Sequence, residues 1–236
     1  MKQMGKFLSI FIFAISFFCL FQGIKIYATT DYATSENDDG TLTITDYYGS
    51  ATDIVIPNQI DGKTVTVIGN GVFLNKNLTN VEIGKNIEKI QYDAFRSNNL
   101  INLTIPDSVK SIESRAFKGN NLTNVEIGKN VETIWSEAFL NNQLTSVVIP
   151  YNVKKIQSKA FYYNNLTKIV IKNGKTIIDV KAFHNQRLPK PDAYVQWYYN
   201  PDKTSVCFLD QTREDNVTLY SYPQAVLSED SLGTLN

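Results

Sequence analysis

A spacing of 22 residues recurs through the middle of the chain and constrains its fold more than any other feature. Leucine, phenylalanine and isoleucine each return at this interval. The four apolar columns are Leu78, Leu100, Leu122, Leu144, Leu166 and Leu188; Phe73, Phe95, Phe117, Phe139, Phe161 and Phe183; Ile83, Ile105, Ile127, Ile149 and Ile171; and Ile68, Ile90, Ile112, Ile134, Ile156 and Ile178. One repeat of this length cannot bury its apolar edge alone, so the repeats must stack on one another. We therefore predict a solenoid of 22-residue coils.

Each repeat opens on a segment in which apolar and polar residues alternate. The segment 78–83 reads Leu-Thr-Asn-Val-Glu-Ile, and Asn86 extends the match to Leu-x-x-Leu-x-Leu-x-x-Asn, the signature of a leucine-rich repeat. The alternation predicts a short strand with one inward face. A second inward segment runs from Ile90 to Phe95, and we expect the phenylalanine column to form a continuous aromatic spine.

Polar residues also keep fixed positions in the repeat. Asparagine pairs follow four of the phenylalanines, at 98/99, 120/121 and 164/165, with 141/142 one position earlier in its repeat. Asparagine tolerates left-handed turn geometry and its amide can satisfy loop backbone groups, so we expect these pairs to build the turn of each coil. Charged columns alternate in sign, as in Glu88, Lys110, Glu132 and Lys154. Equivalent residues of neighbouring coils should lie roughly 5 Å apart, so this alternation favours correct stacking.

The sequence Ile-Pro-Asp-Ser-Val-Lys-Ser-Ile-Glu-Ser-Arg-Ala-Phe at 105–117 resembles the BspA-like class of bacterial leucine-rich repeats, and the resemblance extends over about residues 53–185. It implies a β-rich, right-handed superhelical solenoid. It also implies a secreted or surface protein associated with adhesion and protein binding, without a catalytic residue set. Many members place a cysteine after the Ala-Phe turn, where this chain has asparagine.

The two ends of the chain depart from the repeat. We interpret residues 1–28 as a signal peptide, because two lysines precede the uncharged, mostly apolar run 7–21; an uncleaved membrane anchor is the alternative. Residues 29–60 are expected to form a linker and a β cap with strands at 42–44 and 54–56, and residues 61–187 the leucine-rich repeats. Segment 188–223 resembles the second half of a Listeria–Bacteroides (internalin B-type) repeat, which implies a partial β-grasp-like unit or a C-terminal cap. Residues 224–236 form a tail.

Composition argues against several classes of function. Basic and acidic side chains number 23 each, so the chain lacks the basic excess typical of nucleic-acid binding. With one His and two Cys it offers no four-ligand zinc set, and we predict no metal and no cofactor. His184 has no nucleophile at fixed spacing, so we assign no catalytic residue and predict a protein that is not an enzyme. We expect Cys207 to be a buried strand thiol, with an intermolecular disulfide as the alternative.

The candidate partner-binding residues follow from the strand alternation. It places one set of side chains on the face opposite the core, and open sheets of this kind are the binding surfaces of solenoids. The set comprises Asn80, Glu82, Asn102, Thr104, Asn124, Glu126, Val148, Lys168 and Val170. Trp135 joins them because it stands in a column of polar residues and tryptophan is frequent at binding hot spots. The alternatives are a solvated face and a tryptophan that covers neighbouring side-chain stems.

These features together predict a secreted, non-enzymatic scaffold that binds a protein or a glycan through its strand face. The alternative is a structural protein that assembles with itself or with the cell wall as a spacer. A hydrolase with an unrecognised carboxylate site is a third hypothesis. We expect an extracellular location, with retention at the cell surface left open, and no stable membrane span once the signal peptide is removed.

Overall fold

The computed structural model describes residues 31–166, 168–173, 176–179, 181–183, 186, 198–199 and 205–207. Contacts within the chain define two units, Met1–Asp31 and Tyr32–Asn236, and the fold described below belongs to the second. The expected signal peptide at 1–28 lies outside the described residues and stays a prediction.

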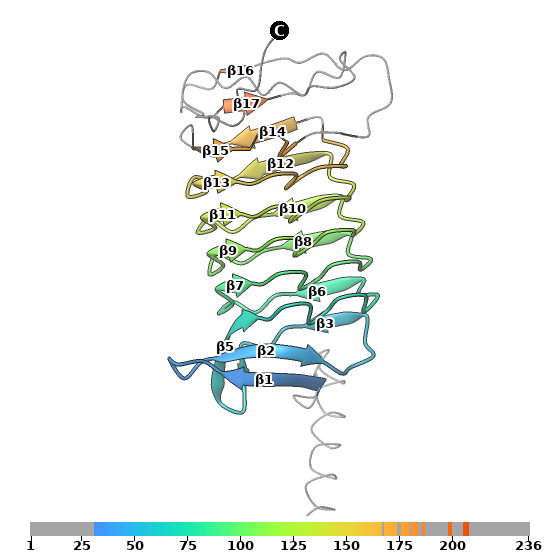
Figure 1. The fold of residues 1–236 in the computed structure, drawn as a ribbon, viewed down its shortest axis with the longest axis vertical. Coiled ribbons are helices and arrows are strands. Elements are labelled where there is room, and N and C mark those ends of the chain that lie inside the picture. The colour runs from blue at the N-terminus through green and yellow to red at the C-terminus, as the bar shows by residue number, and fades with distance from the viewer. Residues whose placement is uncertain are drawn as a thin grey trace, which may run out of the picture. The chain divides into compact units, whose positions relative to one another are not determined.

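Two ribbons of short parallel strands run along the repeats, which confirms the predicted solenoid of 22-residue coils (Figure 1). The first sheet has the order β1-β2-β5-β7-β9-β11-β13-β15. Its strands are β1 (Tyr32–Glu36), β2 (Leu42–Tyr47), β5 (Lys63–Ile68), β7 (Lys89–Ile90), β9 (Ser111–Ile112), β11 (Thr133–Ile134), β13 (Lys155–Ile156) and β15 (Ile177–Ile178). The leucine-rich segments form β3 (Asp53–Val55), β6 (Asn80–Glu82), β8 (Asn102–Thr104), β10 (Asn124–Glu126), β12 (Ser146–Ile149) and β14 (Lys168–Ile171).

The phenylalanine column forms the predicted aromatic spine. Rings of consecutive coils, from Phe73 to Phe183, stack with centroids 4.9–5.5 Å apart and interplanar angles of 3–10°. Every ring in the column is fully buried. Tyr47 of β2 continues the column at its N-terminal end, 5.3 Å from Phe73, and Tyr32 of β1 packs on Tyr47. Strands β1 and β2 therefore cover the apolar end of the first coil.

A column of buried amides runs beside the spine. The amide of Asn98 accepts from the backbone N–H of Leu78 and donates to the carbonyl oxygens of Phe73 and Phe95. Asn120, Asn142, Asn164 and Gln186 repeat this arrangement in the following coils. One amide side chain in each coil thus satisfies the backbone of two coils, as we expected.

The expectation of left-handed geometry is wrong at the pairs 98/99, 120/121 and 164/165, and is met at Asn141 of the adjacent pair 141/142. Positive φ angles fall instead at two other columns of the turn. These are Gly71, Asp93, Arg115, Glu137 and Lys159, with φ of 56–63°, and Asn75, Ser97, Gly119, Asn141 and Tyr163, with φ of 54–67°. The asparagines at 98, 120, 142 and 164 are needed as hydrogen-bonding groups, so the chain bends at the residues before them.

The leucine-rich strands pair two by two: β3 with β6, β8 with β10, and β12 with β14. A proline follows the first strand of each pair, at Pro57, Pro106 and Pro150. Because proline has no N–H, it cannot donate to the preceding coil as Lys172 N does to the carbonyl oxygen of Ile149, at 3.1 Å. Proline therefore ends the ladder before each new pair.

Glycine occupies the equivalent position in the second strand of the first two pairs. A Cβ on Gly84 would lie 2.8 Å from the carbonyl oxygen of Ile56, and one on Gly128 would clash with that of Pro106. Proline and glycine therefore alternate at this position from Gly84 to Pro150, which accounts for the shared glycine of the identical segments 78–86 and 122–130.

Additional strands flank the repeats at both ends. β1 and β2 form an antiparallel hairpin, β2 pairs with β5 in parallel, and β4 (Gln59–Ile60) pairs with β5. The strand expected at 42–44 falls within β2, and the strand expected at 54–56 overlaps β3, which begins and ends one residue earlier. β1 lies in the segment expected to begin as a linker. At the other end β14 pairs antiparallel with β17 (Ser205–Cys207), and β17 with β16 (Tyr198–Tyr199). The rest of 188–223 and the tail lie outside the described residues.

Candidate functional site

The outward side chains of the leucine-rich strands form one surface, which we call the strand face. Val81, Leu103 and Val125 point into the core, and their polar neighbours point outward. The predicted residues Asn80, Glu82, Asn102, Thr104, Asn124, Glu126, Val148 and Lys168 are exposed, and Val170 is half-buried. The structure therefore brings nine of the ten candidate residues onto one surface.

Charge changes sign along the strand face. Asp53, Glu82 and Glu126 lie on the N-terminal and central strands, and Lys168 and Lys172 lie at the C-terminal end. Two hydrogen bonds join neighbouring strands: Asn80 Nδ2 donates to Asp53 Oδ1 at 3.0 Å, and Thr104 Oγ1 donates to Glu126 Oε2 at 3.4 Å. A ligand that lies along this surface would contact amides and carboxylates on the N-terminal and central strands and ammonium groups at the C-terminal end.

Two exposed apolar side chains beside the strand face were not predicted from the sequence. Ile101 immediately precedes β8 and is 51% exposed, and Tyr151 follows β12 and is 67% exposed. Each was detectable by the argument applied to Trp135, since Ile101 stands in a column with Thr79 and Thr123, and Tyr151 in a charged column. Together with Val148 they give this surface apolar contact points.

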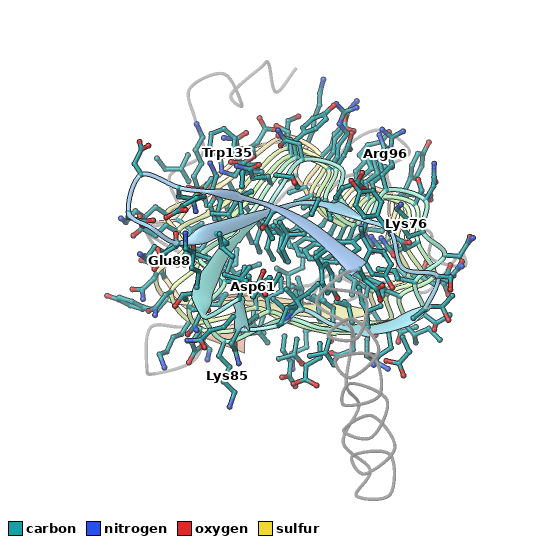
Figure 2. The ribbon with its side chains drawn as sticks, turned by 90° about the horizontal axis from the view of Figure 1, so that it is seen from below. Asp61, Lys76, Lys85, Glu88, Arg96 and Trp135 are labelled. Atoms are coloured by element: carbon teal, nitrogen blue, oxygen red, sulfur yellow. The ribbon has the colours of Figure 1, made fainter. Side chains whose placement is uncertain are left out.

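Trp135 does not belong to the strand face. It follows β11 of the first sheet, its side chain is 40% exposed, and its Nε1 donates to Ser111 Oγ at 3.1 Å. Figure 2 shows Trp135 and Lys85, which follows β6, projecting from opposite sides of the coils. A partner on the strand face would not contact Trp135.

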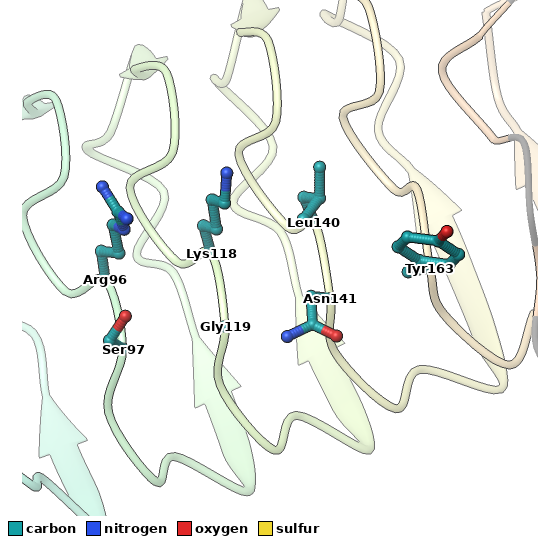
Figure 3. A pocket seen from close by; sticks show the side chains of 7 residues that line it. All are labelled: Arg96, Ser97, Lys118, Gly119, Leu140, Asn141 and Tyr163. Atoms are coloured by element: carbon teal, nitrogen blue, oxygen red, sulfur yellow. The ribbon is translucent and has the colours of Figure 1, made fainter.

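A third surface contains an open pocket of about 420 Å³ at the turns that carry the phenylalanines. Figure 3 shows its lining, which comes from the turns of four successive coils: Arg96, Ser97, Lys118, Gly119, Leu140, Asn141 and Tyr163. Backbone hydrogen bonds join these turns, as from Ser97 N to the carbonyl oxygen of Lys118 at 2.8 Å. The column that holds Arg96, Lys118 and Leu140 is visible in the sequence as a possible partner patch, but the pocket itself forms only when the coils stack.

Ion pairs surround the pocket. Lys118 Nζ lies 2.7 Å from Glu137 Oε2, and this hydrogen bond lowers the pKa of the Glu137 carboxyl. Arg96 lies 3.4 Å from Asp93 Oδ2, and Arg115 Nε lies 3.5 Å from Asp93 Oδ1. Oδ1 is buried and has no hydrogen-bond partner, so its contact with Arg115 is electrostatic.

The alternating charge columns form the expected pairs across coils. Lys110 lies 2.6 Å from Glu88, Lys154 lies 2.6 Å from Glu132, and Lys129 pairs with Asp107. The pairing with Glu88 raises the pKa of Lys110, and the hydrogen bond from Lys129 lowers the pKa of Asp107. Since all these groups are exposed, their role is to favour one stacking register more than to add stability.

The described residues show no arrangement that points to metal chemistry or to a membrane crossing. Within them, no group of three or more His, Cys, Asp and Glu side chains is placed to hold a metal ion. Nor does that part of the chain contain a helix of the length and hydropathy that a membrane span requires. The side chains of His184 and Cys207 lie outside the described set.

The stacked coils, the leucine-rich strands and the exposed strand face define a leucine-rich-repeat solenoid. The chain belongs to the BspA-type leucine-rich-repeat family, whose model, described as the BspA type leucine rich repeat region, matches residues 66–189 in six copies. This confirms the resemblance that the repeat sequence suggested.

One solved structure supports the fold. The chain is similar to the leucine-rich-repeat protein of T. pallidum, with 23% identity, a TM-score of 0.56, and coverage of 66% of this chain and 72% of that one. It also matches a leucine-rich-repeat protein from Bacteroides capillosus, with 27% identity, a TM-score of 0.42 and coverage of 62% and 96%. A leucine rich cell surface protein from Faecalibacterium prausnitzii matches at 21% identity, with a TM-score of 0.37 and coverage of 75% and 59%. No curated protein matches the chain.

Proposed function

We propose that the protein is a secreted, non-enzymatic adhesion scaffold that binds a protein partner through the strand face. The strongest support is that each leucine-rich strand packs one set of side chains into the core and exposes the other set. Val81, Leu103 and Val125 pack inward, while the alternating residues of the same strands project outward across at least five coils. Solenoids of leucine-rich repeats bind proteins on extended surfaces of this kind.

The composition of the strand face favours a protein partner. Exposed Ile101, Val148 and Tyr151 offer apolar anchors of the kind that carry binding energy. The carboxylates of Glu82 and Glu126 add charge to the same surface, and charge complementarity gives specificity and speeds association. An extracellular location, at the cell surface or released from it, fits the family and the predicted signal peptide.

Saturation binding of the mature protein, residues 29–236, to host cells and to bacterial cells tests this function. We expect saturable binding that the double variant Glu82→Lys, Glu126→Lys abolishes. Lys155→Glu is the matched control, because it reverses a charge on the exposed first sheet; its binding curve should equal that of the native protein. Equal binding by the double variant would refute the proposal.

The structural alternative, a self-assembling spacer, makes a different prediction. It requires ordered oligomers, which light scattering coupled to size-exclusion chromatography would detect at increasing protein concentration. The binding scaffold requires only a species of constant mass. Discrete growth in mass, together with no effect of the strand-face substitutions, would favour the spacer.

A further inference from the structure

The pocket across the phenylalanine turns has a lining unlike that of the strand face. Two of its seven lining residues, Arg96 and Lys118, carry a positive charge, and none of the seven has a carboxylate side chain. The strand face instead carries Glu82 and Glu126 in its central part. An anionic ligand would meet two cations in the pocket, in competition with the carboxylates of Asp93 and Glu137 beside it, whereas the centre of the strand face would repel it.

Neutral groups in the pocket add a second recognition chemistry. Ser97 offers a hydroxyl, Asn141 an amide, and Tyr163 an aromatic ring that is 43% exposed. Between them Gly119 leaves the floor without a side chain: a Cβ there would lie 3.7 Å from Ser97 Oγ and 4.0 Å from Asn141 Nδ2. Its φ of 67° also disfavours any larger residue.

The pocket is elongated along the solenoid. Its residues come from four successive coils, and neighbouring parallel segments lie about 4.8 Å apart, so it spans roughly 14 Å from Arg96 to Tyr163. The cations lie at one end and the tyrosine ring at the other (Figure 3). A ligand that matches this lining would present a carboxylate to the cations, hydroxyls to Ser97 and Asn141, and a ring face to Tyr163.

We propose that this pocket binds an oligosaccharide that carries carboxylates, such as a chain of uronic acids. The carboxylate is held by Arg96 and Lys118, hydroxyls bond to Ser97 and Asn141, and one sugar ring stacks on Tyr163. Glu137 competes for Lys118, since its carboxylate lies 2.7 Å from the ammonium nitrogen. This site is independent of the protein partner proposed for the strand face.

Isothermal titration calorimetry with a tetra-uronate tests the site on the mature protein. We expect one site per chain, with affinity that falls as ionic strength rises. Arg96→Gln should weaken binding about tenfold, as expected for one charge-assisted hydrogen bond. Glu137→Gln should strengthen it several-fold, because the competing carboxylate is gone. Lys155→Gln, on another surface, is the control and should change nothing.

Two further ligands and one further variant test which ligand class binds and which surface binds it. A neutral tetrasaccharide and a tetraglutamate peptide should each bind at least tenfold more weakly than the uronate. The variant Glu82→Lys, Glu126→Lys should keep full uronate affinity even though it loses the strand-face partner. The proposal is overturned if Arg96→Gln has no effect, if Glu137→Gln weakens binding, or if either competitor matches the uronate. Because Glu137→Gln is expected to gain affinity, a loss of folding cannot imitate the predicted result.

Discussion

The amide nitrogen of Asn98 lies 2.7 Å from the carbonyl oxygen of Phe73 in the preceding coil, and both residues are buried. The same amide bonds to Phe95 of its own coil and accepts from Leu78. One side chain therefore satisfies three backbone groups that the turn would otherwise leave without partners. This arrangement recurs in each later coil, with Gln186 in the last.

Asn98→Asp should destabilise the protein by about 2–4 kcal/mol, because an aspartate has no N–H to donate to the two buried carbonyl oxygens. Urea unfolding followed by circular dichroism measures this. Asn99→Asp is the matched control, since Asn99 is the exposed neighbour in the same pair. Equal losses for the two variants would show that the amide column does not stabilise the turns.

Phe117→Ala should lower the free energy of unfolding by about 3–5 kcal/mol, because it removes a fully buried ring from the middle of the spine. Its ring stacks on Phe95 at 5.2 Å and on Phe139 at 5.5 Å, so both neighbours lose contacts. Chemical denaturation gives the value. A loss below about 1 kcal/mol would mean that the spine is not the main core of the repeats.

Gly128→Ala should destabilise the protein by about 1–3 kcal/mol, because its Cβ would clash with the carbonyl oxygen of Pro106. Lys172→Ala is the control: it lies at the equivalent position of the third strand pair, where a side chain already fits. Thermal unfolding of both variants compares them directly. If Gly128→Ala were as stable as the control, close approach of the coils would not explain the glycine.

Glu137→Gln should lower stability by about 0.5–1 kcal/mol at neutral pH, because it removes the ion pair with Lys118. The hydrogen bond from Lys118 holds the pKa of Glu137 below that of an unfolded glutamate. Its contribution is therefore complete above the unfolded pKa, about 4.3, and is lost as the pH falls through the lower folded value.

Urea titrations at neutral pH and near pH 3 should accordingly show the difference between native protein and Glu137→Gln shrinking in acid. In a Lys118→Gln background the same substitution should have a smaller effect at neutral pH. A difference that stays constant with pH would assign the loss to packing instead of charge.

The sequence predicted the structural features that are the same in every coil. The columns of Phe117 and Leu122, the inward strand residues and the outward position of Glu82 all follow from periodicity, because each coil buries the same side chains as the next. The sequence analysis also found the charge alternation that places Lys110 against Glu88.

Features that depend on two coils together were harder to predict. Glu137 pairs with Lys118, which lies in a different column, because the turn brings the two side chains to one side. The strand pairing depends on Pro106 facing Gly128, and the pocket between Arg96 and Tyr163 exists only after four coils stack. The columns with positive φ contain Gly71 and Gly119, which are typical of left-handed geometry. They also contain Arg115 and Tyr163, which are not, so the sequence alone does not identify these columns.

Carboxyl labelling with a carbodiimide, with and without bound cell-surface partner, tests the central claim most directly. Glu82 and Glu126 lie on the strand face, whereas Glu88 and Glu132 lie in an exposed charge column beside the first sheet. If the strand face is the binding surface, the partner should slow modification of Glu82 and Glu126 and leave Glu88 and Glu132 unchanged. Protection of Glu88 and Glu132, with Glu82 and Glu126 still modified at the rate of the free protein, would contradict it.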